Sequence, residues 1–256
     1  MSLKSGIDVS YANGEIDWAS VKSHIDFCMI RAGFGSKTID SQFRANAEAC
    51  IRHNIPFGVY WFSYALNENM ARAEAKKCLS AVKPYHLSYP IAFDFEGDSL
   101  NYAKRQGVVI TANKMCLIAC AFLDEILANG YDVLLYTNPD FWYNRGFKNL
   151  GNRYPIWCAH WNVEKPGIYC AMWQDSSTAR IEGINGNVDT DISFVEKNTE
   201  STIEKVCADY GEQYTRTARQ VIAGAYGNGD VRIKKLLEER KDPSFVQDLV
   251  NAILKG

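Results

Sequence analysis

Eight short apolar runs, with amphipathic segments between the early ones, are the feature that most constrains the fold of this chain. Strands that alternate with helices are typical of a parallel sheet, and eight such strands indicate closure as a barrel. The clearest helices are expected at residues 41–53, 68–82 and 111–129. The strands are expected near Gly6–Ser10, Phe27–Gly33, Pro56–Tyr64, Tyr89–Glu96, Asp132–Asn138, Tyr154–Trp161, Cys170–Ser176 and Val188–Phe194.

The last three apolar runs lie too close together in the sequence for full crossover helices between them. We therefore expect an irregular α/β barrel of the (β/α)5β3 type, whose final strands are joined by loops or hairpins. This barrel domain is expected to cover residues 1–198.

After Phe194 the strand pattern stops and three helices are expected, near Thr202–Ala223, Asp230–Arg240 and Pro243–Leu254. A strong turn signal, Tyr226-Gly227-Asn228-Gly229, separates the first two. We expect residues 199–256 to form a small all-α domain of three helices.

Composition disfavours several classes of partner. The net charge of -2 argues against a nucleic acid, because binding a duplex depends on a strong basic excess. No apolar run reaches the length of a bilayer span, so membrane insertion is not expected. The scattered histidines and the cysteines without a CxxC pair disfavour a metal, a cofactor or a disulfide framework. The first six residues lack the apolar stretch of a secretory signal, so export is expected by another route or with a signal since removed.

The polar residues that end the apolar runs are expected to meet at one mouth of the barrel, where active sites of this architecture lie. Several are carboxylates and several are aromatic, which is the lining expected of a sugar site. They are Asp8, Arg31, Tyr60, Phe62, Tyr64, Asp94, Glu96, Tyr136, Asn138, Trp157, His160, Trp161, Gln174, Asp189 and Asp191.

Asp94 and Glu96 are the sharpest of these features. Residues two apart in a strand project from the same face, roughly 6.6 Å apart along it. Two carboxylates this close cannot both ionise easily, so one pKa is expected to rise and leave a proton donor beside an ionised neighbour. The alternative is that both are solvated loop residues. Asp8 is equally consistent with a cap or turn, and Arg31 with a core charge that pairs one of the acids.

On these residues the chain resembles glycoside hydrolase family 25, the cellosyl-type lysozymes of bacteria and phage endolysins. The resemblance spans residues 6–196. It is carried by seven short motifs in order: Gly6-Ile7-Asp8-Val9-Ser10, Met29-Ile30-Arg31-Ala32-Gly33-Phe34-Gly35, Gly58-Val59-Tyr60-Trp61-Phe62, Ala92-Phe93-Asp94-Phe95-Glu96, Pro155-Ile156-Trp157-Cys158-Ala159-His160-Trp161, Trp173-Gln174 and Val188-Asp189.

The resemblance implies a flattened, TIM-like barrel and hydrolysis of the β-1,4 bond between N-acetylmuramic acid and N-acetylglucosamine, without a cofactor. It implies that Glu96 is the general acid, that Asp94 stabilises the reacting centre, and that Asp8 and Asp189 complete the site. Trp61 and Asp191 depart from the family pattern, and Asp191 leaves open which of the two late aspartates lines the groove. The implied groove-lining residues are Arg31, Tyr60, Phe62, Tyr64, Tyr136, Trp157 and Gln174.

The C-terminal helices resemble the helical cell-wall-binding repeat of some phage endolysins. The residues that carry this resemblance are Tyr226, Gly227, Asn228, Gly229 and Arg232. It implies binding to bacterial peptidoglycan and action on the cell wall, outside the cell or after release as an endolysin. The alternative is a plain stabilising tail.

Two other functions stay open. One is a non-catalytic glycan-binding protein on the same scaffold, against which the retention of both Asp94 and Glu96 speaks. The other is a hydrolase of a glycan such as chitin. A chitinase of the common barrel family would carry a further aspartate two residues before Asp94, where this chain has Ala92.

Overall fold

The structure is a computed structural model, and it describes residues 3–194, 216–239, 241, 246–247, 250–251 and 253–254. The chain divides into two compact units, Met1–Thr199 and Glu200–Gly256. The expected boundary after residue 198 lies outside the described residues.

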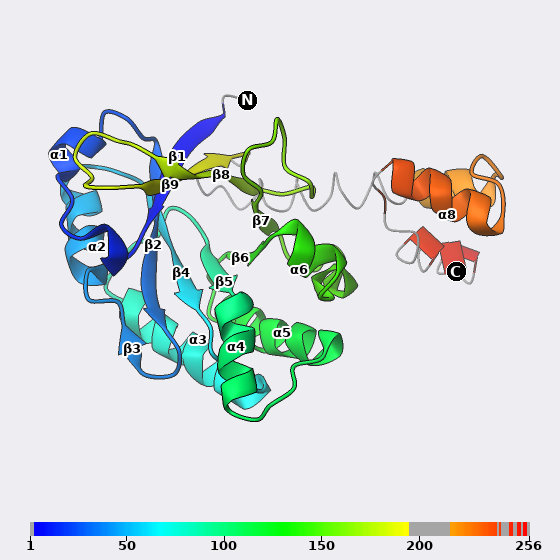
Figure 1. The fold of residues 1–256 in the computed structure, drawn as a ribbon, viewed down its shortest axis with the longest axis horizontal. Helices are drawn as coiled ribbons and strands as arrows, with labels where there is room; N and C mark the ends of the chain where they lie inside the picture. Colours follow the sequence, from blue (N-terminus) through cyan, green and yellow to red (C-terminus); the bar gives the residue numbers. More distant parts are fainter. Residues whose placement is uncertain are drawn as a thin grey trace. The chain divides into compact units, whose positions relative to one another are not determined.

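Eight strands of the first unit close into a barrel (Figure 1). Their order is β1-β9-β8-β7-β6-β5-β4-β2, and β1 pairs with β2 to complete the ring. A two-residue strand, β3 (Thr38–Ile39), pairs with β2 alone. The barrel strands are β1 (Lys4–Val9), β2 (Phe27–Phe34), β4 (Phe57–Phe62), β5 (Ile91–Asp94), β6 (Val133–Thr137), β7 (Ile156–Ala159), β8 (Met172–Ala179) and β9 (Val188–Ser193).

The barrel changes character after β7. All neighbouring barrel strands from β1 through β2 and β4 to β8 pair in parallel, whereas β9 runs antiparallel to both β8 and β1. Residues 160–171 join β7 to β8 without a helix, and a hairpin loop at residues 180–187 joins β8 to β9. The expected irregular barrel, with loops or hairpins between its final strands, is confirmed.

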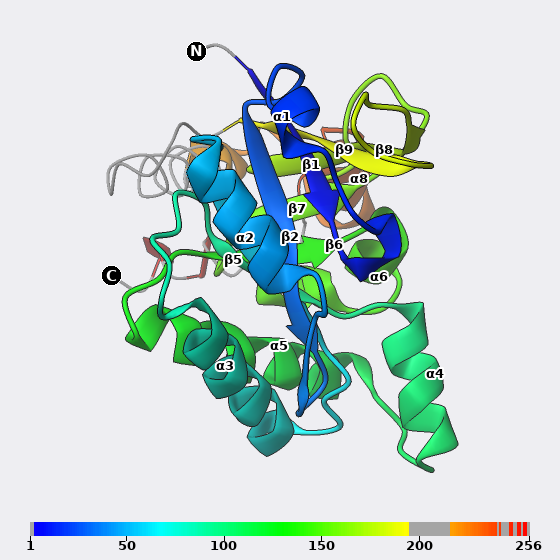
Figure 2. The same cartoon turned by 90° about the vertical axis from the view of Figure 1, so that its left-hand side faces the viewer.

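Helices cover the outside of the barrel, and Figure 2 shows α2 lying across β2. Helices were expected for α2, α3 and α5, and α3 has the expected bounds. Asn67 and Thr111 cap α3 and α5 by accepting from the backbone N–H groups of Met70 and Lys114. The helices are α1 (Trp18–Val21), α2 (Phe43–Arg52), α3 (Glu68–Val82), α4 (Gly97–Arg105), α5 (Ala112–Ala128) and α6 (Pro139–Tyr143), with short 3-10 turns η1 (Tyr11–Asn13) and η2 (Phe147–Leu150).

Alternation along the strands separates an apolar outer layer from a polar interior. Ile7 and Val9 pack in the outer layer against the helices, so Asp8 between them points into the barrel. Phe93 and Phe95 belong to the same layer, so Asp94 points inward as well. Other outer-layer members include Val59, Trp61, Ile156, Cys158 and Trp173. The interior therefore receives the side chains between them, which include most of the expected site residues.

The second unit is helical where it is described. Residues 216–222, α8 (Gly229–Glu238) and the described positions from 246 onward are helical, whereas residues 202–215 of the first expected helix lie outside the described part. Its core consists of Ala218, Val221, Tyr226, Leu236, Val246 and Val250. Among the described helices of both units, none combines the length and apolar character that a bilayer crossing requires.

Glu74 is a fully buried carboxyl group on α3. It accepts hydrogen bonds from the Ser63 hydroxyl (2.6 Å) and the Tyr64 backbone N–H (3.1 Å), and so ties α3 to the end of β4. Burial raises the pKa of Glu74 from 4.5 to about 7 despite these two hydrogen bonds.

Glu74→Gln is expected to flatten the pH dependence of stability between pH 4.5 and about 7. In this window the unfolded chain releases the Glu74 proton while the folded protein keeps it, so the wild type loses stability as pH rises. Removing one such group lowers the slope by at most about 1.4 kcal/mol per pH unit. Urea unfolding followed by tryptophan fluorescence measures it, because all six tryptophans lie in the barrel unit.

The matched control is Glu48→Gln, which makes the same change on α2, where Glu48 forms a surface pair with Arg44. If the Glu74→Gln profile runs parallel to those of the control and the wild type, the buried carboxyl group does not titrate in this window.

Candidate active site

The side chains of five acidic residues converge inside the barrel. β9 brings Asp189 directly opposite Asp8 of β1, and Asp191 lies opposite Gly6 and Gln174. Asp94 at the end of β5 and Glu96 just after it complete the group. Asp8, Asp94 and Asp191 are buried, whereas Glu96 and Asp189 are half-buried and face the mouth. The sequence-predicted acids are thus brought together by four different elements.

Glu96 lies outside the strand in which it was expected. β5 ends at Asp94, and Glu96 is the residue that starts α4, a helix missing from the sequence-based prediction. Its backbone stays extended (φ -126°, ψ -169°), so its side chain still projects on the same side as that of Asp94. Its N–H donates to the Ser99 hydroxyl at 3.1 Å, which fixes the start of the helix. Glu96 thus keeps the extended backbone of the strand before it, but it is already the first capping residue of α4.

Asp94 and Glu96 form a hydrogen-bonded carboxyl pair. Burial raises the pKa of Asp94 well above its usual value, and the charge of Glu96 raises it further. Burial also raises the pKa of Glu96, while the hydrogen bond from Asp94 works in the opposite direction. Such a pair titrates as a unit, so the two groups share one proton under conditions in which two separate carboxyl groups would both be ionised. The second oxygen of Asp94, Oδ1, is buried without a hydrogen-bond partner.

Asp189 and Asp191, between which the sequence leaves the groove-lining role open, have different surroundings. Asp191 is 1% exposed, and its Oδ1 accepts from the Trp157 indole N–H at 2.8 Å inside the barrel. Asp189 is half-buried beside the mouth, and burial raises its pKa to about 6. Burial and the neighbouring charge of Asp8 raise the pKa of Asp191 well above its usual value. Asp189 is therefore the more accessible member of this pair.

Three expected groove-lining aromatics lie deeper than predicted. Tyr60 and Tyr136 contact the Trp157 ring edge-on, with centroids 5.9 and 4.9 Å away, and all three residues are buried. Phe62 and Tyr64 are half-buried nearer the rim, with their ring centroids 5.2 Å apart. Phe62 and Tyr64 are thus the more exposed members of this group of aromatic residues.

The rim next to Glu96 contains residues that the sequence analysis missed. The Tyr64 hydroxyl donates to Asp98 on α4 at 2.6 Å, and its ring packs against Tyr102 at 5.1 Å. Asp98 and Tyr102 were missed because α4 itself was missed. Trp161, noted at the end of β7 but not selected, is 45% exposed and completes the aromatic rim.

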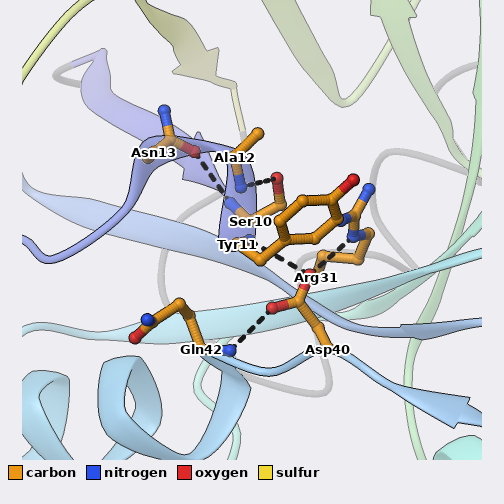
Figure 3. Close-up of polar contacts among 7 residues, drawn as sticks. All are labelled: Ser10, Tyr11, Ala12, Asn13, Arg31, Asp40 and Gln42. Atoms are coloured by element: carbon orange, nitrogen blue, oxygen red, sulfur yellow. Dashed lines mark hydrogen bonds and ion pairs between the residues drawn. The ribbon is translucent and has the colours of Figure 1, made fainter.

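Arg31 does not pair with one of the site acids, contrary to one expectation. Its Nε donates to Asp40 Oδ2 at 2.8 Å, and its guanidinium lies over the ring of Tyr11 (Figure 3). The guanidinium also lies over the ring of Phe34. Asp40 also accepts from the backbone N–H groups of Tyr11 (3.1 Å) and Gln42 (2.9 Å). These four residues, Tyr11, Arg31, Asp40 and Gln42, form the Asp40 cluster, which joins η1, β2 and the approach to α2. Asp40 lies outside any strand pattern, so the sequence carried no signal for it.

Gln174, expected in the groove lining, is buried instead. Its side chain contacts Asp8, Tyr136 and Trp161 through hydrogen bonds of 2.7, 3.0 and 3.1 Å. Gln174 therefore links Asp8 of the acid cluster to the partly exposed Trp161.

In the second unit, the residues of the expected binding motif hold the unit together. The buried Tyr226 donates its hydroxyl proton to Glu239 at 2.6 Å. Arg232 donates to the Gly227 carbonyl, the Asn228 side chain and Gln247 at 2.9–3.1 Å. Gly227 and Gly229 both adopt positive φ angles, which favour glycine. These residues shape the turn and attach it to the last helix.

Within the residues that the structure describes, no group of three His, Cys, Asp or Glu side chains has the geometry to hold a metal ion. The seven described cysteines are free.

The chain is similar in sequence and structure to several known proteins. Lysozyme M1 of Streptomyces globisporus is 28% identical over 200 residues, which cover 72% of this chain and 65% of the relative. The modular autolysin LytC from Streptococcus pneumoniae, solved with a synthetic peptidoglycan ligand, superposes with a TM-score of 0.67 at 28% identity, covering 75% of this chain and 47% of that one. The bacterial lysozyme from Streptomyces coelicolor superposes with a TM-score of 0.63 at 25% identity. The match covers 81% of this chain and 97% of that one.

The chain thus spans about two thirds and about half of the first two proteins. The family model of glycosyl hydrolases family 25 matches residues 7–184, and the CW_7 repeat model matches residues 216–254. Because the first match covers most of the 256 residues, the chain belongs to glycosyl hydrolases family 25 and carries a CW_7 repeat toward its C-terminal end.

Proposed function

We propose that this chain is a peptidoglycan hydrolase, an N-acetylmuramidase that cleaves the β-1,4 bond between N-acetylmuramic acid and N-acetylglucosamine. The observation that carries the proposal is the gathering of Asp94 and Glu96 with Asp8 and Asp189 inside the barrel, near the half-buried rings of Phe62 and Tyr64. Family membership and the lysozymes among the relatives support a glycan-cleaving reaction.

Glu96 is the proposed general acid. It is half-buried while Asp94 is 4% exposed, so Glu96 is the member of the pair that a bound glycan reaches. The shared proton passes through Glu96 to the oxygen of the leaving sugar, and the bond from that oxygen to the anomeric carbon breaks. Asp94 keeps the negative charge that remains and is the proposed stabilising group, and its Oδ1 is buried without a hydrogen-bond partner.

Asp8 and Asp189 are proposed to complete the site from the opposite side of the barrel. Their positions face each other across the β1–β9 pairing, and their negative charges act on each other and on Glu96. A positive charge that develops on the sugar in the transition state is stabilised by ionised carboxylates at this place. Asp189, with a pKa of about 6, is ionised at neutral pH and can also orient the water that completes hydrolysis.

The substrate groove is proposed to run along the half-buried and exposed rings of the rim. Phe62, Tyr64 and Trp161 present aromatic surface on which pyranose rings can stack. Arg31, Tyr60, Tyr136, Trp157 and Gln174 support this surface from inside the barrel.

The CW_7 repeat is proposed to attach the enzyme to the bacterial wall, where the protein acts. Residues 199–256 are proposed as its domain and 1–198 as the catalytic domain. Tyr226, Arg232 and the Gly227–Gly229 turn maintain its shape. Covalent linkage raises the effective concentration of the barrel at the wall even when a single repeat binds weakly. The peptidoglycan ligand of the pneumococcal autolysin supports a peptidoglycan partner.

Two alternatives are separated by products. A non-catalytic glycan-binding protein on this scaffold would release nothing from purified walls, and a chitin hydrolase would cleave chitin fragments in preference to muropeptides. Mass analysis of the products, with their reducing ends identified, distinguishes the three.

Glu96→Gln is expected to lower the rate of wall lysis by at least about 100-fold, because the amide cannot donate the proton to the leaving oxygen. A turbidity assay on purified walls measures the rate, and circular dichroism verifies the fold. Glu48→Gln, the same change outside the site, is expected to leave the rate unchanged. A wild-type rate in Glu96→Gln contradicts the assignment.

Deletion of residues 199–256 is expected to weaken attachment to insoluble walls while leaving cleavage of small soluble muropeptides within about twofold, because small substrates gain nothing from linkage. Sedimentation with walls measures attachment, and chromatography of soluble products measures cleavage. Equal losses in the two assays would mean that the repeat serves only to stabilise the barrel.

A further inference from the structure

Gln174 makes three hydrogen bonds from the interior of the barrel. Its Oε1 accepts from the Tyr136 hydroxyl and from the Trp161 indole, and its Nε2 donates to Asp8 Oδ2 at 2.7 Å. The residue is 3% exposed, so these partners, rather than solvent, set its orientation.

The chemistry of the partners determines which way the amide faces. An indole Nε1–H is a donor only, so the atom that meets Trp161 must be the amide oxygen. The amide nitrogen consequently faces Asp8 and can only donate to it. A glutamine is one of few side chains that can accept from an indole at one end and donate to a carboxylate at the other.

Asp8 needs such a donor because its other surroundings oppose its ionised form. Burial raises its pKa most, the charge of Asp189 adds to this, and the hydrogen bond from Gln174 lowers it. The titratable and charged groups that interact electrostatically with Asp8 are Cys28 and Arg31 on β2, Tyr60 on β4, Asp94 on β5, Glu96 at the start of α4, Tyr136 on β6, and Asp189 and Asp191 on β9. Gln174, which does not titrate, adds a hydrogen bond from its amide nitrogen to the Asp8 carboxylate.

The other end of the amide sets the position of a rim ring. Trp161 follows β7 and exposes 45% of its surface, yet its indole nitrogen is held from inside the barrel by Gln174. Its plane is therefore tied to the same side chain that holds Asp8.

We propose that Gln174 is a positioning residue for glycan hydrolysis, whose one buried amide holds the carboxylate of Asp8 and the indole of Trp161 in a fixed relative orientation. The role rests on the proposed hydrolase function. Gln174 does not touch the substrate; it acts through Asp8 on the reacting centre and through Trp161 on the sugar that stacks at the rim.

Two substitutions at position 174 and one at the rim separate these effects. Gln174→Glu keeps an oxygen for Trp161 and Tyr136 but replaces the donor to Asp8 with a second carboxyl group. It is expected to move the acidic limb of the kcat/KM profile up by about one pH unit or more, with KM at the optimum nearly unchanged. Trp161→Phe keeps a ring but removes the N–H, and is expected to raise KM without moving the limb. Gln174→Met has a side chain of similar length without an amide. It is expected both to move the acidic limb and to raise KM.

Soluble muropeptide hydrolysis by the full chain from pH 4 to 8 measures these parameters, with circular dichroism as the fold check. Gln106→Met, the same substitution at the exposed C-cap position that follows α4, is expected to match the wild type. A readout without activity is the indole N–H resonance of Trp161, identified by its loss in Trp161→Phe and expected to shift in Gln174→Met.

An unmoved indole resonance, or a Gln174→Glu profile whose acidic limb coincides with that of the wild type, overturns the proposal even where activity falls. If Gln174→Met does not fold, Gln174→Glu and Trp161→Phe still decide it. A wild type that cleaves no muropeptide at any pH is the separate result that rejects the hydrolase function, and the positioning role with it.

Discussion

The antiparallel pairing of β9 between β1 and β8 is the constraint on which the site depends. It closes the barrel, and its register sets Asp189 opposite Asp8 and Asp191 opposite Gln174. A shift of one residue would turn both aspartates of β9 toward the outer apolar layer, because side chains alternate between the two faces of a strand. The strand that breaks the parallel pattern is thus the one that supplies two of the five acids.

Burial of several acids in one interior is unfavourable for their ionised forms, and the nearby cation does little to offset it. Arg31 lowers the pKa of Asp8 and Asp94, but its direct partner is Asp40. The site instead supplies hydrogen-bond donors to the deepest acids: Trp157 donates to Asp191, and Gln174 donates to Asp8. The result is a set of carboxyl groups with raised pKa values, of which those nearest the mouth, Glu96 and Asp189, are the most accessible.

Sequence patterns predicted the barrel well because its strands are continuous apolar runs bounded by polar residues. Asp8 and Asp94 were assigned to the mouth of the barrel for the same reason, because each ends an apolar run. Glu96 was predicted to lie in a strand, and its backbone is indeed extended. Nothing in the alternation of the sequence marks the start of α4 at this residue. The buried role of Gln174 and the presence of Asp40 depend on contacts between distant segments, which no local pattern records.

In the Asp40 cluster, Asp40 accepts a hydrogen bond from the backbone N–H of Tyr11, not from its side chain. The Tyr11 ring, half exposed beside the mouth, contributes only its face to the guanidinium of Arg31. Any aromatic side chain can supply such a face. Position 11 is accordingly a place where the rim can be given a new shape, by protein engineering or by natural drift, while the framework that carries the acids stays intact.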